Sequence, residues 1–390
     1  MSDVLKMRKF AFAAPRDGSC DVLVLAGEHS GDEQAARMVL EARKKNPDLK
    51  VCAFGGGALA AAGAQLLFDF TGFSVVGLME VLKNISFFSA LGSAIVDWIR
   101  TYRPKAVCFV DYPGFNLRLA DTLCKRGIAV KGGGNVKLLY YISPQIWAWK
   151  SSRRFKMAKM LDSLAVIFPF ETKCYADTSL KADFVGHPFL AEGYVPPVRY
   201  SPDGDILLLA GSREIAVSRI FPILLKTMRL LGGERAVALY PSQAIRAVLE
   251  NCLAKFPDLA DRVRIVGRSA LPLAAKGVMM SSGTMSLSCC LAGIPGAIVY
   301  RANPLTYICG RMVVNIEYLG IANILLDKPA WREFIQFDAS AEKIAAYMKT
   351  AITQRGKYAA YARELFSLLR AEAEGGEPTL QAAELLDCME

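Results

Sequence analysis

One carboxylate in the sequence follows an apolar stretch of strand length and precedes two residues that break regular structure. Residues 106–110, AVCFV, predict a buried strand, and Asp111 follows it directly. Pro113 and Gly114 then force a loop. Because the carboxyl ends of parallel strands form the ligand crevice of an open sheet, Asp111 is a candidate general base. A second role remains open, in which Asp111 caps the helix expected to begin near Phe115.

A second stretch, residues 205–222, predicts an anion site. The apolar run Ile206–Ala210 has strand length, Gly211 gives the turn, and Ser212 is expected to cap the helix that follows. A helix N-terminus presents unpaired N–H groups, and the planar guanidinium of Arg213 offers donors that match phosphate oxygens. An ordinary strand-to-helix turn with a surface arginine is the alternative. The apolar residues expected on one face of the helix are Ile215, Ile220 and Leu224.

Two further groups of side chains suit polar ligands. The uncharged loop Ser281–Thr284 follows an expected strand at 277–280, and its N–H groups and hydroxyls can cradle phosphate. Trp147 and Trp149 flank one alanine shortly before the arginine pair 153–154. Aromatic rings beside arginines suit a sugar, a base or the headgroup of an acylated glycolipid, although packing is the default role of a tryptophan.

The elements that would position these groups alternate between strand and helix. A strand at 21–26, a turn at 27–32, a helix at 33–45 and a strand at 51–54 form a βαβ unit, whose crossover implies a parallel sheet. The turn lacks the GxGxxG pattern of a dinucleotide-binding fold, which disfavours a nicotinamide enzyme. The alternation resumes in the second half, with strands expected at 206–210, 236–240, 263–266, 277–280 and 296–300.

This alternation predicts an α/β fold with two doubly wound, Rossmann-like domains that face a cleft. The proline-containing segment 193–205 is typical of a linker. We therefore expect an N-terminal domain over 1–195 and a C-terminal domain over 206–390, with the last helices free to pack back on the first domain. Residues 73–100 are rich in large apolar side chains and predict a pair of core helices. The whole arrangement fits a GT-B type nucleotide-sugar transferase.

Composition limits the classes of partner. The 390 residues carry a net charge of +10, which is compatible with nucleic acid, an anionic lipid surface or a phosphorylated substrate. Nucleic acid is disfavoured because the lysines and arginines are scattered rather than gathered in long runs. The ten cysteines include no CxxC motif, and neither histidine has a cysteine at ligand spacing, so we expect no metal site. Cysteines within apolar runs indicate a cytoplasmic protein.

Taken together, several short motifs resemble those of the lipid-A-disaccharide synthase family, from about Asp21 to Gln336. The resemblance implies an inverting, metal-independent GT-B hexosyltransferase without a cofactor. The implied reaction moves diacylglucosamine from UDP-diacylglucosamine to the 6-hydroxyl of diacylglucosamine 1-phosphate (lipid X) and releases UDP. The motifs are AGEHSGD (26–32), VVGLMEVL (75–82), DYPGFN (111–116), YISPQIWAWK (141–150), FVGHP (184–188), GSR (211–213), SSGTMSL (281–287), and Asn323 with EFIQ (333–336).

The resemblance also implies roles for individual residues and a location. Asp111 would be the general base. The enzyme would associate peripherally with the anionic cytoplasmic face of the inner membrane of a Gram-negative type bacterium, in an oligomeric state that the sequence leaves open. The donor would be bound by Gly211, Ser212, Arg213, Ser282, Gly283, Thr284, Ser288, Asn323, Glu333 and Gln336. The acceptor lipid would be bound by Glu28, Ser30, Val76, Met79, Ser143 and Trp147.

Two positions depart from the family pattern, because Ala216 and Ser288 stand where glutamate is usual. At Ser288 a two-point grip on the ribose would be lost, which predicts an affinity loss on the order of 1–3 kcal/mol. An alternative interpretation therefore remains, namely a degenerate GT-B protein that binds nucleotide or glycolipid without catalysis. A GT-B type nucleotide-sugar epimerase is disfavoured, since the sequence offers no clear set of carboxylates and histidines for that reaction.

Overall fold

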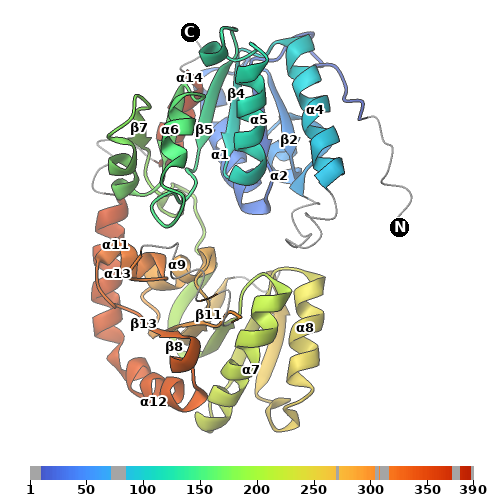
Figure 1. The fold of residues 1–390 in the computed structure, drawn as a ribbon. Coiled ribbons are helices and arrows are strands. Elements are labelled where there is room, and N and C mark those ends of the chain that lie inside the picture. The colour runs from blue at the N-terminus through green and yellow to red at the C-terminus, as the bar shows by residue number, and fades with distance from the viewer. Residues whose placement is uncertain are drawn as a thin grey trace. The chain divides into compact units, whose positions relative to one another are not determined.

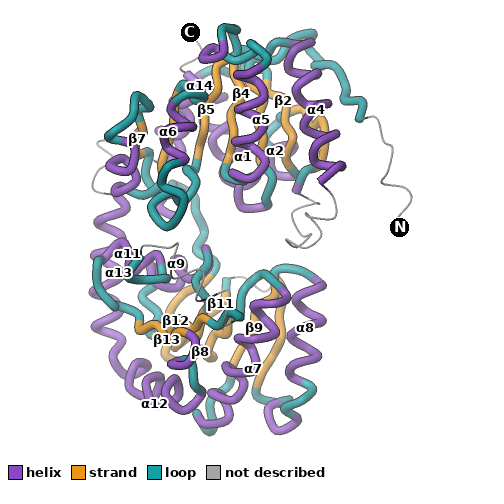
Figure 2. Tube along the Cα trace, in the orientation of Figure 1, coloured by secondary structure: helices purple, strands orange, loops and turns teal. Residues whose placement is uncertain are grey.

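The computed structural model describes residues 10–71, 85–268, 272–303, 307, 316–370 and 378–387. The chain divides into two compact units. Unit 1 comprises Met1–Glu192 with Leu369–Glu390, and unit 2 comprises Gly193–Leu368. Each unit contains a parallel sheet flanked by helices (Figure 1 and Figure 2). The α/β class predicted from the sequence is therefore confirmed.

Unit 1 is built on a seven-stranded parallel sheet with the order β3-β2-β1-β4-β5-β6-β7. The strands are β1 (Val22–Ala26), β2 (Val51–Gly55), β3 (Gln65–Asp69), β4 (Ala106–Val110), β5 (Lys137–Tyr141), β6 (Ser163–Val166) and β7 (Ala182–Phe184). The helices are α1 (His29–Lys45), α2 (Gly57–Ala61), α4 (Ile85–Tyr102), α5 (Pro113–Lys125), α6 (Arg153–Ala158) and α14 (Pro378–Asp387). Short 3-10 helices lie at Val130–Gly132, Pro169–Tyr175 and Pro188–Leu190.

The central strands of unit 1 are covered on both faces, as their uninterrupted apolar runs predict. Every residue of β1, β2 and β4 is buried. One face of the sheet packs against a core that includes Phe54, Phe109 and Tyr140. On the other face, α14 packs against α1 and contributes Ala382 and Leu386 to the core. The last described helix of the chain is therefore part of unit 1.

Unit 2 is built on a six-stranded parallel sheet with the order β10-β9-β8-β11-β12-β13. Helix α7 packs against α8 and α12 on one face of this sheet. The strands are β8 (Val198–Leu209), β9 (Ala236–Tyr240), β10 (Val263–Gly267), β11 (Leu273–Met280), β12 (Gly296–Tyr300) and β13 (Arg332–Ile335). The helices are α7 (Glu214–Leu230), α8 (Gln243–Leu253), α9 (Thr284–Leu291), α11 (Ile321–Leu326), α12 (Ala341–Ala351) and α13 (Arg355–Arg370), with 3-10 helices at Pro257–Leu259, Gln336–Asp338 and Ile352–Gln354.

The expected linker at 193–205 is wrong over most of its length, because Val198 already begins β8. Val198 pairs with Leu273 of β11, and the pairing resumes at Asp205 after an irregularity. That irregularity takes up Pro202, which cannot donate a hydrogen bond to a ladder. Pairing with a strand far along the chain therefore overrides the local proline signal.

The apolar segment 73–100 was expected to form two helices. The second is present as α4, which buries Leu91, Ile95 and Ile99. The first helix was expected in a segment that includes residues 72–84, which lie outside the described residues. Across the described ranges, we find no helix with both the length and the apolar character required to cross a membrane.

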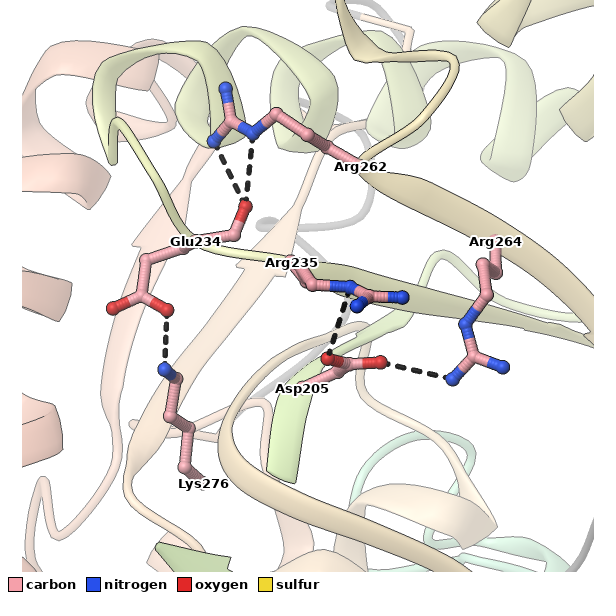
Figure 3. Close-up of polar contacts among 6 residues, drawn as sticks. All are labelled: Asp205, Glu234, Arg235, Arg262, Arg264 and Lys276. Atoms are coloured by element: carbon pink, nitrogen blue, oxygen red, sulfur yellow. Dashed lines mark hydrogen bonds and ion pairs between the residues drawn. The ribbon is translucent and has the colours of Figure 1, made fainter. Parts of the chain in front are cut away.

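A network of ion pairs ties the strands of unit 2 together near the amino ends of β9 and β10 (Figure 3). The Asp205 carboxylate accepts a hydrogen bond of 3.0 Å from Arg264 and lies 4.0 Å from Arg235. The Glu234 carboxylate pairs with Lys276 of β11. Ligands bind at the opposite, carboxyl ends of parallel strands, so this network supports the sheet rather than a ligand.

Candidate active site

The strand order reverses near the centre of each sheet, and this reversal indicates where ligands bind. It lies between β1 and β4 in unit 1 and between β8 and β11 in unit 2. Loops that leave such neighbouring strands in opposite directions open a crevice at the carboxyl ends. The residues singled out from the sequence fall on these loops, with Glu28 and Asp111 in unit 1 and Gly211 and Ser282 in unit 2.

In unit 1 the loops after β1 and β4 approach each other closely. A Cβ atom on Gly27 would lie 2.5 Å from the ring of Tyr112, which is closer than real contacts allow. Only glycine therefore fits at this position of the AGEHSGD motif. The predicted turn at 27–32 is too long, because the Asp32 N–H already bonds to the Glu28 carbonyl at 2.9 Å and α1 begins at His29.

The backbone of Asp111 is held in an unusual conformation. Asp111 and Tyr112 both lie in the left-handed region, with φ of 47° and 48°. Each such non-glycine residue costs on the order of 1–3 kcal/mol unless its surroundings hold it. The Asp111 carbonyl accepts hydrogen bonds from the Tyr140 hydroxyl at 2.7 Å and from Asn116 Nδ2 at 2.8 Å. Both donors are fully buried, so they fix the turn that presents the Asp111 side chain.

The capping role considered for Asp111 is wrong. Helix α5 begins at Pro113, and Tyr112 occupies the N-cap position. Burial raises the pKa of the Asp111 carboxyl to about 6, the negative charge of Glu28 acts in the same direction, and a hydrogen bond from the Tyr112 N–H opposes both. A carboxylate with a pKa this close to neutrality is suited to accept a proton and still be mostly ionised at pH 7.

The AGEHSGD motif divides into an exposed part and a buried part. Glu28 and Ser30 are exposed at the amino end of α1. Asp32 is only 3% exposed, and its carboxylate accepts N–H bonds from Gly56 at 2.7 Å and Ala58 at 2.9 Å. Asp32 therefore fixes the glycine loop after β2. Sequence reasoning missed this role, because an aspartate after a glycine turn is common in ordinary turns.

Two of the other residues expected to bind the acceptor, Ser143 and Trp147, belong to the described part of the chain. Ser143 is buried, and its hydroxyl forms a hydrogen bond of 2.7 Å with the hydroxyl of Tyr175. Its side chain therefore points into the interior of unit 1. Trp147 is partly exposed, and its Nε1 donates to Glu171 at 3.3 Å. Val76 and Met79 lie outside the described residues.

Glu171 is a buried carboxylate that sequence reasoning did not single out. It accepts N–H bonds from Ile167 at 3.2 Å and Phe168 at 3.1 Å, besides the bond from Trp147. Burial raises the pKa of Glu171 to about 8, against these three hydrogen bonds, and the charge of Asp111 contributes to the rise. No sequence signal distinguishes such a glutamate from a surface one.

In unit 2 the loops after β8 and β11 lie side by side. The Ser281 N–H donates to the Leu209 carbonyl at 2.7 Å. Gly211 has φ of 119°, and a Cβ atom on it would lie 3.4 Å from Ser281 Oγ. Glycine is therefore required for the left-handed turn and leaves room for the neighbouring loop. These loops lead into α7 and α9, so two helix amino ends, each able to bind an anion, lie on adjacent strands.

The first turn of α7 differs in detail from the prediction. The helix begins at Glu214, so Arg213 rather than Ser212 is the N-cap, and no side chain caps the first turn. The expected cap by Ser212 is wrong, and the amide groups of the first turn stay available. Arg213 is exposed and forms no ion pair with any residue that the structure describes. Ile215, expected on the core face, is 59% exposed, because its position five residues before the buried Ile220 places it about 140° around the helix from that residue.

The loop after β11 carries the other predicted donor residues. Ser282 is partly exposed, and Gly283 and Thr284 are exposed, with Gly283 at the N-cap of α9. Ser288, one of the two departures from the family pattern, is 4% exposed and lies within α9, where its hydroxyl is 3.5 Å from that of Tyr194. A ribose at Ser288 would compete with that contact. Ala216 packs against the core of unit 2.

The remaining predicted donor residues make internal hydrogen bonds. Glu333 accepts N–H bonds of 2.9 Å each from Leu319 and Gly320 and a bond of 2.9 Å from Asn323 Nδ2. Asn323 is fully buried and also donates to the Trp331 carbonyl at 2.7 Å. These two side chains hold the segment before α11 in place.

Gln336, the last predicted donor residue, bridges two loops. Its Oε1 accepts the Ala302 N–H at 2.7 Å, which joins the loop after β12 to the loop after β13. Within the described parts of the chain, we find no group of three or more histidine, cysteine or acidic side chains that could hold a metal ion.

Comparison with known proteins identifies the family. Residues 22–381 match the family described as lipid-A-disaccharide synthetase. Lipid-A-disaccharide synthase 1 of Legionella pneumophila strain Philadelphia 1 is 33% identical over 339 residues, which cover 84% of this chain and 86% of the relative. The lipid-A-disaccharide synthase of Nitrosococcus oceani is 32% identical over 372 residues, which cover 92% of this chain and 94% of the relative.

Solved structures share the fold at low sequence identity. A UDP-GlcNAc 2-epimerase from Neisseria meningitidis bound to UDP-GlcNAc matches with a TM-score of 0.57 at 12% identity, covering 87% of this chain and 94% of the other. Spinosyn rhamnosyltransferase matches with a TM-score of 0.51 at 14% identity, covering 92% of this chain and 97% of the other. At these identities the comparison supports the GT-B type fold alone.

Proposed function

Since the chain belongs to the lipid-A-disaccharide synthase family, we propose that it moves diacylglucosamine from UDP-diacylglucosamine to the 6-hydroxyl of diacylglucosamine 1-phosphate. The family match, which spans nearly the whole chain, carries this proposal. The chain is a glycosyltransferase of lipid A biosynthesis that acts on a UDP-sugar and a lipid. The comparisons give no support to a degenerate protein that binds without catalysis.

In the proposed reaction, Asp111 takes the proton of the acceptor 6-hydroxyl. The oxygen then attacks the anomeric carbon of the donor from the face opposite the diphosphate. The new carbon–oxygen bond forms while the bond to the diphosphate breaks, and UDP leaves with that electron pair. The support comes from the position of Asp111 at the strand reversal of unit 1 and from its raised pKa of about 6.

The departing diphosphate gains negative charge in the transition state, and we assign its stabilisation to unit 2. The exposed guanidinium of Arg213 is a cation, and the amide N–H groups at the amino ends of α7 and α9 carry partial positive charge at the ends of adjacent strands. Ser282, Gly283 and Thr284 would supply further donors from the second loop. Asn323 and Glu333 would act indirectly, by holding the segment at 319–320.

The acceptor is assigned to unit 1, where Glu28 and Ser30 are exposed beside Asp111 at the strand reversal. Trp147 would contact the acceptor with the exposed part of its ring, whereas Ser143 would support the loop from inside. We further propose that the enzyme works at the anionic cytoplasmic surface of the inner membrane. The net charge of +10 supports attraction to such a surface.

An assay of UDP release tests the proposal. Purified protein with both acylated sugars should release UDP, and an Asp111→Ala variant should lose about 10²–10⁴ in turnover, the usual contribution of general base catalysis. Asp97→Ala, at an exposed aspartate of unit 1, is the matched control. Undiminished turnover by Asp111→Ala would refute the role of base.

A further inference from the structure

A cavity of about 210 Å³ lies at the carboxyl ends of β12 and β13 in unit 2. It is large compared with the roughly 30 Å³ that a water molecule occupies in the liquid. Neither glycine loop of the predicted diphosphate site lines it. The lining residues are Arg219, Arg301, Ala302, Asn303, Gln336 and Phe337.

The charge of this cavity is positive and uncompensated. Arg219 comes from the second turn of α7 and Arg301 follows β12. Among the residues that the structure describes, no acidic side chain lines the cavity. Neither arginine forms an ion pair with another residue in the described part of the chain. Two guanidinium groups that face a common space without a carboxylate match the oxygens of a phosphate, because each guanidinium offers a planar fork of donors.

A hydrogen bond joins two of the loops that line the cavity. Gln336 has φ of 54°, a conformation that costs a non-glycine residue free energy, and its side chain is buried. Its Oε1 accepts the Ala302 N–H at 2.7 Å, so the loops after β12 and β13 are fixed to each other. This bond places Arg301 and Phe337, the neighbours of the bonded residues, on the same cavity. Strained backbone of this kind clusters at ligand sites.

An apolar group stands beside the two cations. The ring of Phe337 is 86% exposed, which is unusual for a large aromatic side chain. A ring beside phosphate-binding arginines can pack against the apolar face of a sugar. The cavity therefore combines the two chemistries that a phosphorylated sugar presents.

We infer that Arg219 and Arg301, which line this cavity, bind the phosphate of a phosphorylated sugar, in addition to the groups assigned to the two glycine loops. The inference rests on the proposed function, which supplies two phosphorylated glucosamines. The phosphate is either the 1-phosphate of the acceptor or the diphosphate of the donor.

The test compares the double variant Arg219→Ala/Arg301→Ala with the double variant Arg235→Ala/Arg264→Ala. The control removes the same charge from the amino ends of the strands (Figure 3). Circular dichroism on heating establishes that both variants fold. The KM for diacylglucosamine 1-phosphate and the Kd of UDP, measured by calorimetry, are then determined for each protein.

If the Arg219→Ala/Arg301→Ala variant shows a rise of tenfold or more in the KM for the acceptor, with its Kd for UDP within twofold of wild type, the two arginines bind the phosphate of the acceptor. A rise of tenfold or more in the Kd for UDP would instead show that they bind the diphosphate of the donor. The inference is overturned if both constants stay within twofold, or if the control variant changes them as much. If the wild-type protein releases no UDP from the two sugars, the proposed function fails, and titration of the same variants with UDP and inorganic phosphate still tests the cavity.

Discussion

Replacing Asp111 by asparagine should lower turnover by about 10²–10⁴ and at the same time stabilise the folded protein at neutral pH. Burial and the charge of Glu28 raise the pKa of Asp111 to about 6 in the folded chain. In the unfolded chain an aspartate has a pKa of about 3.9. The difference is about two pKa units, and each unit corresponds to about 1.4 kcal/mol. Ionised Asp111 therefore lowers the free energy of unfolding by up to about 3 kcal/mol. Because the side chain is partly exposed, we expect about 1–3 kcal/mol.

The sign of the pH dependence follows from these two pKa values. Below about pH 4 the carboxyl is protonated in both states and costs nothing. Between about pH 4 and 6 the unfolded chain releases the proton while the folded chain keeps it, so wild-type stability falls as the pH rises. Above about pH 6 the full cost is present. Asparagine removes this cost, and it also tolerates the left-handed backbone at this position.

Two measurements on the variant test this reasoning. Thermal unfolding at pH 7.5 should show a midpoint raised by about 2–10 °C, and the gain should disappear near pH 4. UDP release should fall by about 10²–10⁴. Asp97→Asn, at an exposed aspartate paired with Arg100, should change neither quantity at either pH. The reasoning is refuted if Asp111→Asn keeps its turnover, or if its midpoint gain is the same at both pH values.

Three further changes address the turns around the candidate site. Gly27→Ala would drive a methyl group into the ring of Tyr112, so we expect a loss of about 1–3 kcal/mol in unfolding free energy, and an unchanged urea midpoint would contradict the contact. Tyr140→Phe removes one donor to the Asp111 carbonyl and should lower kcat about tenfold with little change in KM, whereas a pure KM effect would speak against positioning. Arg213→Ala should weaken UDP binding by about 10- to 100-fold in calorimetry, and an unchanged Kd would remove the residue from the diphosphate site.

The bounds of strands that consist of a single apolar run could be predicted closely from the sequence. Residues 106–110, 236–240 and 296–300 have the predicted bounds. The start of β8 could not be predicted in this way, because Val198 is in the strand only through its pairing with β11, far along the chain. Pairing between distant segments outweighs local composition wherever the local signal is weak.

The position of candidate site residues was easier to predict than the direction of their side chains. Asp111 could be placed at the end of a strand because an apolar run precedes it. Ser143 and Asn323 proved to be buried and bonded inside, and Asp32 and Glu171 proved to hold loops that the sequence did not connect to them. Such roles depend on the neighbours that folding supplies, and a motif read along the chain does not name those neighbours.

The most direct test of glycosyl transfer is a product balance measured by mass spectrometry. Purified protein given UDP-diacylglucosamine and diacylglucosamine 1-phosphate should form UDP and the disaccharide 1-phosphate in equal amounts. Omitting either sugar should abolish both products. Isomerised donor in the absence of acceptor, or tight UDP binding without any disaccharide, would contradict the assignment.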